Sequence, residues 1–188
     1  MNDLIDVSEI VAGTMRMDTL PVELGSIVQA CVDEARPAAD AKSIQLGVSI
    51  APDAMLWGDA HRLAQATRTL LSNALKFTPD GGRVSVEVMR KDEVLLLRVD
   101  DTGKGIPPGE LPYVFEPLRI GDGSLKRTHG GLGIGLYLAR HIVEAHGGRV
   151  WAESVGDGGG ATLVAELPRE KETAALVDRV TGTRRTSR

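Results

Sequence analysis

A run of glycines at alternate positions, leading directly into an amphipathic helix, constrains this chain more than any other stretch. The glycines are Gly131, Gly133 and Gly135, and apolar residues follow at helical spacing over residues 136–143. Glycine has no Cβ, so the backbone amides of such a run can approach a ligand closely, and a helix N-terminus favours an anion. The pattern predicts a phosphate-binding loop. The alternative is a flexible loop before an ordinary helix.

Two common phosphate-binding motifs do not fit this run. A Walker A loop places Lys and then Ser or Thr after its last glycine, whereas this chain has Leu136 and Tyr137. A dinucleotide-binding fingerprint follows a buried strand, whereas the polar segment 121–128 precedes this run. A long polar approach to a glycine-hinged helix instead predicts a mobile lid, residues 121–130, that closes over phosphates.

Composition narrows the class of protein. With 188 residues, of which 42% are hydrophobic and 3% aromatic, we expect one domain with a core of Leu, Val, Ile and Ala. A net charge of −4 does not support binding to nucleic acid or to an anionic membrane. The single Cys31 cannot form an internal disulfide, and no apolar run approaches the roughly 18 residues of a membrane helix. We expect a cytoplasmic domain, which leaves open a membrane anchor upstream in the parent protein.

Apolar periodicity predicts four helices and five strands. The helices are expected at residues 2–17, 23–39, 59–77 and 136–146, with Asp59 as the N-cap of the third and Pro37 weakening the end of the second. The strands are expected at residues 44–50, 84–89, 94–99, 149–154 and 161–167. The strand at 94–99 is almost continuously apolar, as expected for a central strand covered on both faces. Residues 169–188 are polar and predict a disordered tail.

The third helix carries a second group of candidate site residues. Its polar side chains recur every three or four positions: Arg62, Gln65, Thr69, Asn73 and Lys76. Such a stripe can line a cleft, where the amide oxygen of Asn73 suits a Mg²⁺ that takes its other ligands from water and nucleotide phosphates, and Lys76 could meet a phosphate. The alternative is that the stripe is the solvated face of the helix.

A carboxylate at the end of a strand is the third candidate. Asp101 ends the apolar run and is followed by Gly103 and Gly105, where a flat ring could approach the backbone. A buried carboxylate can accept a hydrogen bond from an exocyclic amino group, which would select adenine over guanine. A surface turn rich in Asp and Gly is the alternative. Farther on, Phe115 is expected to be a packing residue.

Taken together, these motifs resemble those of the ATP-binding catalytic domain of sensor histidine kinases, within the GHKL superfamily. The resemblance covers about residues 20–168. It rests on a segment like the N box at residues 70–78, one like the first glycine box at 101–105, one like the F box at 115–117 and one like the second glycine box at 131–136. Membership would imply a Bergerat-type α+β fold, a two-layer sandwich of a mixed sheet of about five strands with about three helices on one face.

The resemblance also implies roles for individual residues. Asn73 would hold Mg²⁺, Asp101 would accept from the adenine amino group, and Lys76 and Arg119 would lie near phosphates. The other positions of the motifs that would contact ATP are Gly103, Gly105, Ile106, Phe115, Gly131, Leu132, Gly133, Ile134, Gly135 and Leu136.

Some positions depart from the family pattern. Thr69 stands where such kinases usually carry a second Asn, and Leu118 stands where a Phe is common. The acceptor motif of the family is absent from the surroundings of all four histidines: His61, His129, His141 and His146.

The segment 1–18 resembles the end of a dimerisation helix, so the acceptor histidine would lie upstream, on a helix outside this chain. The function implied is the catalytic half of a two-component histidine kinase that transfers the ATP γ-phosphoryl to that histidine. The implied partners are the dimerisation and phosphoacceptor helix domain of a homodimeric parent kinase and a response regulator receiver domain. The alternative is a nucleotide-binding module with impaired turnover at Thr69. A GHKL ATPase or serine-kinase regulator would need a catalytic acid in the N-box helix, and no Glu or Asp lies between Arg62 and Phe77.

Overall fold

A computed structural model describes residues 8, 10, 12, 14–117 and 134–169 of the chain. Its centre is a five-stranded mixed sheet in the order β2-β4-β5-β7-β6. The strands are β2 (Gln45–Ile50), β4 (Arg83–Lys91), β5 (Val94–Asp101), β6 (Arg149–Glu153) and β7 (Ala161–Pro168). Only β2 and β4 pair in parallel, and the other neighbours pair antiparallel.

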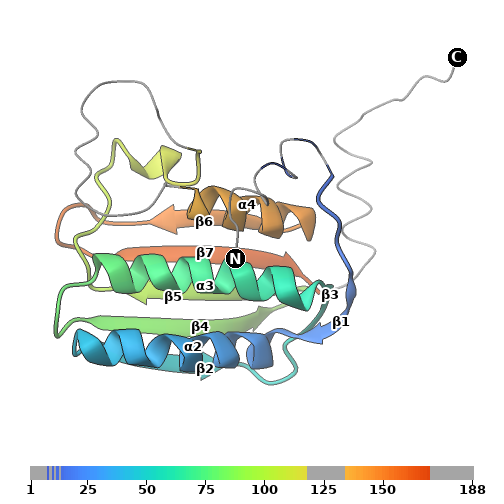
Figure 1. The fold of residues 1–188 in the computed structure, drawn as a ribbon, viewed down its shortest axis with the longest axis horizontal. Coiled ribbons are helices and arrows are strands. Elements are labelled where there is room, and N and C mark those ends of the chain that lie inside the picture. Colours follow the sequence, from blue (N-terminus) through green and yellow to red (C-terminus); the bar gives the residue numbers. More distant parts are fainter. Residues whose placement is uncertain (1–7, 9, 11, 13, 118–133, 170–188) are drawn as a thin grey trace, which may run out of the picture.

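Three helices cover one face of this sheet, as Figure 1 shows. They are α2 (Leu24–Ala41), α3 (Ala60–Phe77) and α4 (Gly135–Ala145), and a short 3₁₀ helix, η1 (Leu111–Tyr113), follows β5. The two-layer α+β sandwich expected from the sequence is therefore confirmed. No helix of the described residues is long and apolar enough to cross a membrane.

Strand β5 is central, but only one of its faces is fully covered. Leu95, Leu97 and Val99 are buried in the core, whereas Leu96 and Arg98 on the other face are only half-buried. The expectation that residues 94–99 are covered on both faces was wrong, because all three helices pack on the same side of the sheet. The alternation also places Asp101 on the helix-covered face and Asp100 on the open face.

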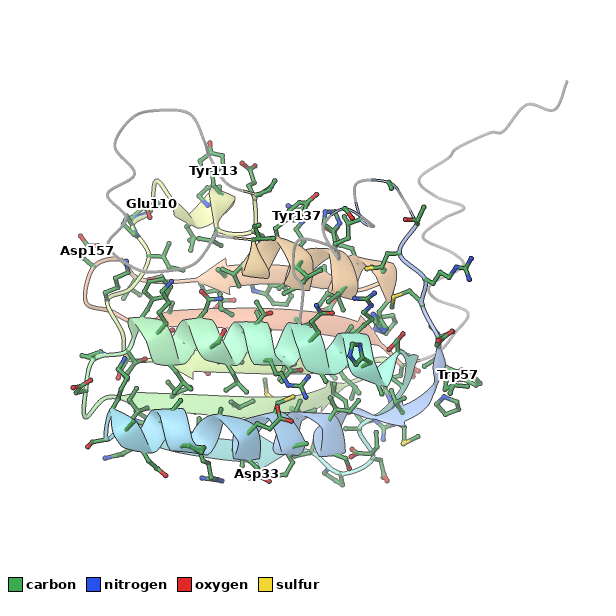
Figure 2. The ribbon with its side chains drawn as sticks, in the orientation of Figure 1. Asp33, Trp57, Glu110, Tyr113, Tyr137 and Asp157 are labelled. Atoms are coloured by element: carbon green, nitrogen blue, oxygen red, sulfur yellow. The ribbon has the colours of Figure 1, made fainter. Side chains whose placement is uncertain are left out.

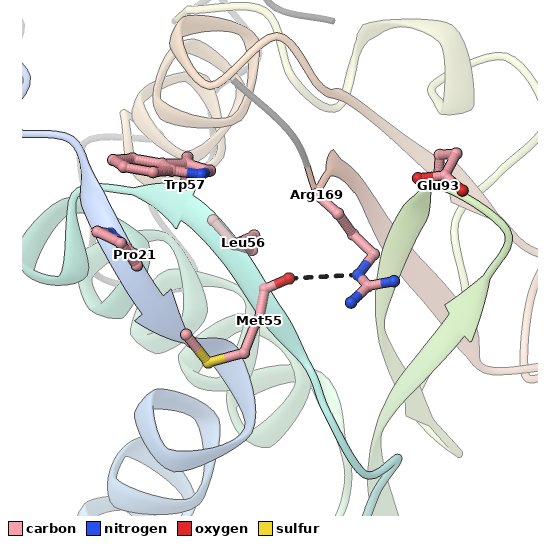
Figure 3. A pocket seen from close by; sticks show the side chains of 6 residues that line it. All are labelled: Pro21, Met55, Leu56, Trp57, Glu93 and Arg169. Carbon is pink, nitrogen blue, oxygen red and sulfur yellow. Dashed lines mark hydrogen bonds between the residues drawn. The ribbon is translucent and has the colours of Figure 1, made fainter. Parts of the chain in front are cut away.

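A two-stranded ribbon was missed in the sequence. Strands β1 (Leu20–Glu23) and β3 (Met55–Gly58) pair antiparallel, and each has four residues, too few for a periodic signal. Arg169 joins the ribbon to the main sheet, because its carbonyl accepts from Trp57 N (3.2 Å) and its own amide donates to Glu93 O (3.0 Å). Arg169 Nε also donates to Met55 O at 3.3 Å, at the edge of a hollow of about 190 Å³ (Figure 3).

Two helix ends differ from expectation. Helix α2 continues through Pro37 to Ala41, since Pro37 is exposed, where water can satisfy the carbonyl that loses its helical partner, and Ala39 beyond it is buried in the core. The N-terminal helix, expected to reach residue 17, ends earlier, because residues 14–19 have no regular secondary structure. The tail expected at 169–188 lies outside the described residues from residue 170 onward.

Candidate functional site

Helix α3 begins at the expected N-cap and presents two distinct sides. The carboxylate of Asp59 accepts from the amides of His61 (3.0 Å) and Arg62 (3.1 Å), which satisfies donors that a helix N-terminus leaves unpaired. The other side of the helix is buried in the core: Leu63, Thr67, Leu70, Leu71, Ala74 and Leu75.

The polar stripe of α3 is not a simple solvated face. Gln65 is only 5% exposed and accepts from Arg62 Nη1 at 3.1 Å. Thr69 and Asn73 are half-buried, and Lys76 at the end of the stripe is exposed. The solvent-facing alternative therefore holds for Lys76 but not for the residues before it.

Within the described part of the chain, the amide oxygen of Asn73 has no protein partner. Its Nδ2 donates to Thr69 O at 3.0 Å, and since a carbonyl only accepts, the nitrogen must be the atom that faces Thr69. Among the described residues no donor reaches Asn73 Oδ1. This oxygen fits the role expected of a Mg²⁺ ligand, because Mg²⁺ commonly takes one or two protein oxygens and completes its shell with water and phosphate. No group of three or more acidic, His or Cys side chains that could hold a metal exists in the described part of the chain.

Asp101 is held by backbone amides through one oxygen. Its Oδ1 accepts from Gly103 N at 2.8 Å and from Ala161 N at 3.3 Å. No other group within the described ranges donates to Oδ2, so this second oxygen can accept from a ligand. Burial raises the pKa of the Asp101 carboxyl above its usual range, and the two amide hydrogen bonds oppose that shift. The alternative of a plain surface turn does not account for such a partly buried, backbone-bound carboxylate.

The first glycine segment packs directly against the end of α3. A Cβ at Gly103 would lie 2.5 Å from Phe77 O, so no other residue fits there without a shift. The next amide, Lys104 N, donates to Phe77 O at 3.3 Å. Lys104 and Lys76 both place their ammonium groups near the Phe77 ring, 4.6 and 5.1 Å from its centroid. The C-terminal end of α3 and the first glycine segment, residues 101–105, therefore pack directly against each other.

The start of α4 meets α3 one turn before Asn73. Gly135 is the first residue of α4, and a Cβ there would lie 3.1 Å from Thr69 Cγ2. Ile134 at the N-cap position makes no side-chain capping bond, so the cap residue itself offers no side-chain acceptor to the first amides of the helix. Ile134 is buried, and Leu136 packs against the core.

The remaining expected site residues divide into two groups. Gly105 adopts a positive φ of 76°, Ile106 donates its amide to Ser154 Oγ at 3.0 Å, and Phe115 is 7% exposed, which confirms it as a packing residue. The other group lies outside the described residues, as do Leu118 and the expected lid at 121–130: Arg119, Gly131, Leu132 and Gly133.

Contacts that the sequence did not predict come from the turn between β6 and β7, residues 154–160, whose tip residue Asp157 lies at the same end of the molecule as Glu110 (Figure 2). The sequence predicts only the two strands on either side of this glycine-rich turn, and nothing local to it indicates its neighbours. A second missed feature is a groove of about 410 Å³ between α2 and α3, which Lys76 lines at one end.

Comparisons with known proteins identify relatives of this arrangement. The family described as histidine kinase-, DNA gyrase B-, and HSP90-like ATPase matches residues 58–171. The circadian input-output histidine kinase CikA of Synechococcus elongatus is 34% identical over 173 residues, which cover 90% of this chain and 23% of that protein. The sensor histidine kinase GacS of Pseudomonas protegens is 33% identical over 181 residues, covering 93% of this chain and 20% of GacS. The chain thus spans about a fifth of the length of these relatives.

Solved structures agree with the sequence relatives. The mycobacterial sensor histidine kinase MprB superposes with a TM-score of 0.70 at 28% identity, over 81% of this chain and 98% of the MprB chain. Full-length ShkA in complex with AMPPNP gives a TM-score of 0.77 at 26% identity, over 89% of this chain and 34% of ShkA. The catalytic domain of ThkA, at 21% identity and a TM-score of 0.72, shares the fold over 84% of this chain and 99% of its own.

Proposed function

Because the chain belongs to the family of histidine kinase-, DNA gyrase B- and HSP90-like ATPases, we propose that it is the catalytic half of a two-component histidine kinase, binding ATP and transferring its γ-phosphoryl group to a histidine outside this chain. The observation that carries the proposal is the convergence of three sequence motifs on the C-terminal half of α3. Gly103 contacts Phe77, Gly135 contacts Thr69, and Asn73 lies between these two contacts along the helix.

The side of this site formed by Asp101 recognises the base. Two backbone amides fix Oδ1, so Oδ2 accepts from the exocyclic amino group of adenine. Guanine carries a carbonyl oxygen at the same position, and a carboxylate facing that oxygen would be repelled. The raised pKa of Asp101 means that acidification weakens this recognition at a higher pH than it would for an ordinary aspartate.

The side formed by α3 and α4 serves the phosphates. Asn73 Oδ1 would hold Mg²⁺, which supplies charge neutralisation at the phosphate oxygens when bound. Lys76 adds a positive charge one turn farther along α3, and the uncapped amides at the start of α4 favour an anion. Phosphoryl transfer needs little covalent chemistry from the protein, so positioning and electrostatic stabilisation account for catalysis.

The partners remain proposals that the relatives support. ThkA has been solved in complex with the response regulator protein TrrA, and its likeness to this chain at 19% identity concerns the fold. We propose a response regulator as the partner downstream, and a phosphoacceptor helix of a homodimeric parent kinase as the acceptor of the phosphoryl group. A cytoplasmic location stays a prediction from the sequence.

Calorimetric titration with ATP and GTP in the presence of Mg²⁺ tests the proposal. ATP should bind and GTP should bind at least tenfold more weakly. Asp101→Asn should cost about 1.5–3 kcal/mol of ATP binding, roughly tenfold or more in affinity, because it removes a charge-assisted hydrogen bond.

Asp100→Asn is the matched control. The Asp100 carboxylate faces the open side of the sheet, where it accepts from Arg98 Nη2 (2.8 Å) and Thr162 Oγ1 (2.5 Å), so ATP affinity should stay unchanged. Equal binding of ATP and GTP, or an Asp101→Asn variant with wild-type affinity, contradicts the assignment of Asp101 to adenine.

A further inference from the structure

The β6–β7 turn, residues 154–160, packs against the base-binding segment, residues 101–105. Gly158 N donates to Lys104 O at 2.6 Å, and Gly160 N donates to Gly103 O at 3.2 Å. The chain after the turn continues the contact, because Ala161 N is one of the two donors to Asp101 Oδ1. The turn and the residue after it therefore hold the carbonyls of Gly103 and Lys104 and the carboxylate of Asp101.

The two segments approach so closely that side chains are excluded from the interface. A Cβ on Gly105 would lie 2.0 Å from Gly156 O, and a Cβ on Gly160 would lie 2.0 Å from Asp101 O. Both glycines have positive φ, 76° and 71°. The base-binding segment is thus packed between the end of α3 on one side and the β6–β7 turn on the other.

One hydroxyl organises the turn. Ser154 Oγ accepts from Ile106 N (3.0 Å) and from Gly156 N (3.2 Å), and it donates to Gly160 O (2.7 Å). A hydroxyl has one donor and two acceptor sites, so these three bonds use its full capacity. Ser154 is half-buried, and its partners are backbone groups of the turn and of Ile106, which continues the base-binding segment.

From this geometry we infer that Ser154 is a positioning residue for adenine recognition, acting through the β6–β7 turn on Asp101. Ser154 does not touch the base. Its three hydrogen bonds fix the turn. The turn fixes the direction of the Asp101 carboxylate through Ala161 N, which donates to Oδ1, and through Gly160 N, which holds the carbonyl of Gly103, the residue that supplies the other donor to Oδ1. The inference rests on the proposed function, since it concerns the recognition of ATP.

The test compares ATP with purine riboside triphosphate, which lacks the 6-amino group. In the wild-type protein ATP should bind at least tenfold more tightly. In Ser154→Ala the affinity for ATP should fall about tenfold, while the affinity for purine riboside triphosphate stays within twofold of the wild type, so that the selectivity is lost. A purely structural role would lower both affinities together.

Three further variants keep the result interpretable. Ser154→Cys serves if Ser154→Ala does not fold. Cysteine is nearly isosteric with serine but is a weak acceptor, so this variant should fold and lose the selectivity for ATP. Ser154→Thr keeps the hydroxyl and should retain the selectivity for ATP over purine riboside triphosphate. Ser85→Ala, a half-buried serine on the open face of β4, is the matched control and should behave as wild type.

The outcomes separate the two proposals. If the wild-type protein binds and discriminates but Ser154→Cys keeps the full selectivity, the role of Ser154 is overturned and the proposed function stands. If the wild-type protein binds neither nucleotide, both proposals are overturned.

Discussion

At the scale of single residues, His146 joins two helices that border the proposed nucleotide site. Its Nδ1 lies 2.7 Å from Ile142 O, so this nitrogen carries the proton, and Nε2 accepts from Asp59 N at 2.9 Å. Burial lowers the pKa of His146 below its ordinary value, and the nearby Asp59 carboxylate partly opposes this shift. The folded protein therefore favours the neutral imidazole, which alone can satisfy both contacts.

This arrangement predicts a pH dependence of stability. The unfolded chain binds a proton on His146 at its ordinary pKa of about 6.5, and the folded chain does so only at lower pH. The contribution of His146 is thus fully present above that pH and is lost as the pH falls below it. Urea unfolding at pH 8.0, 6.5 and 5.5 should show that the free energy of unfolding of the wild type declines as the pH falls. The decline should be smaller in His146→Gln, whose side chain cannot titrate. Parallel pH profiles of the free energy of unfolding for the two proteins would contradict this role of His146.

At the scale of elements, the end of α3 depends on a residue from the preceding helix. Lys42, at the end of α2, donates from Nζ to Leu75 O (2.7 Å) and to Thr78 O (2.5 Å), carbonyls that the helix end leaves unpaired. Thr78 is buried, so water cannot readily replace the lysine there. Asn73 and Lys76 lie on this last part of α3. By bonding its terminal carbonyls, Lys42 therefore helps to hold these two residues of the proposed nucleotide site in position.

Lys42→Met should lower the free energy of unfolding by about 2 kcal/mol, because it keeps the apolar stem but removes two charge-assisted hydrogen bonds. The melting temperature should fall by about 5 °C. Lys91→Met, an exposed lysine at the end of β4, serves as the control and should stay within about 0.5 kcal/mol of wild type. A Lys42→Met variant as stable as this control would show that the two hydrogen bonds of Lys42 Nζ contribute nothing to the free energy of unfolding.

At the scale of the whole molecule, the proposed function makes the chain a catalytic part whose phosphoacceptor lies elsewhere. None of its four histidines stands in the acceptor motif of the family, and His146 is buried among backbone partners. Incubation of the isolated chain with radiolabelled ATP and Mg²⁺ should therefore leave the protein unlabelled. The same sample should bind ATP by calorimetry, which separates a missing acceptor from a misfolded protein. An acid-labile label on any of the four histidines would require a different mechanism.

The sequence by itself determined most of the elements and the candidate residues of this protein. The periodicity of apolar residues located α3, α4 and all five strands of the main sheet, because burial on one face repeats every two residues in a strand and about every 3.6 in a helix. Asp59 could be identified as an N-cap because capping is local. The alternation along β5 even explains why Asp101 faces the helices and Asp100 does not.

Only the tertiary structure decided how these parts support one another. The bond from Ile106 N to Ser154 Oγ spans 48 residues, and that from Asp59 N to His146 Nε2 spans 87. No pattern near Ser154 indicates such a partner, since the contact arises from the pairing of β5 with β7, which brings the β6–β7 turn beside the base-binding segment. The ribbon of β1 and β3 was missed for the same reason: strands of four residues are stabilised by their neighbours in space rather than by their own sequence.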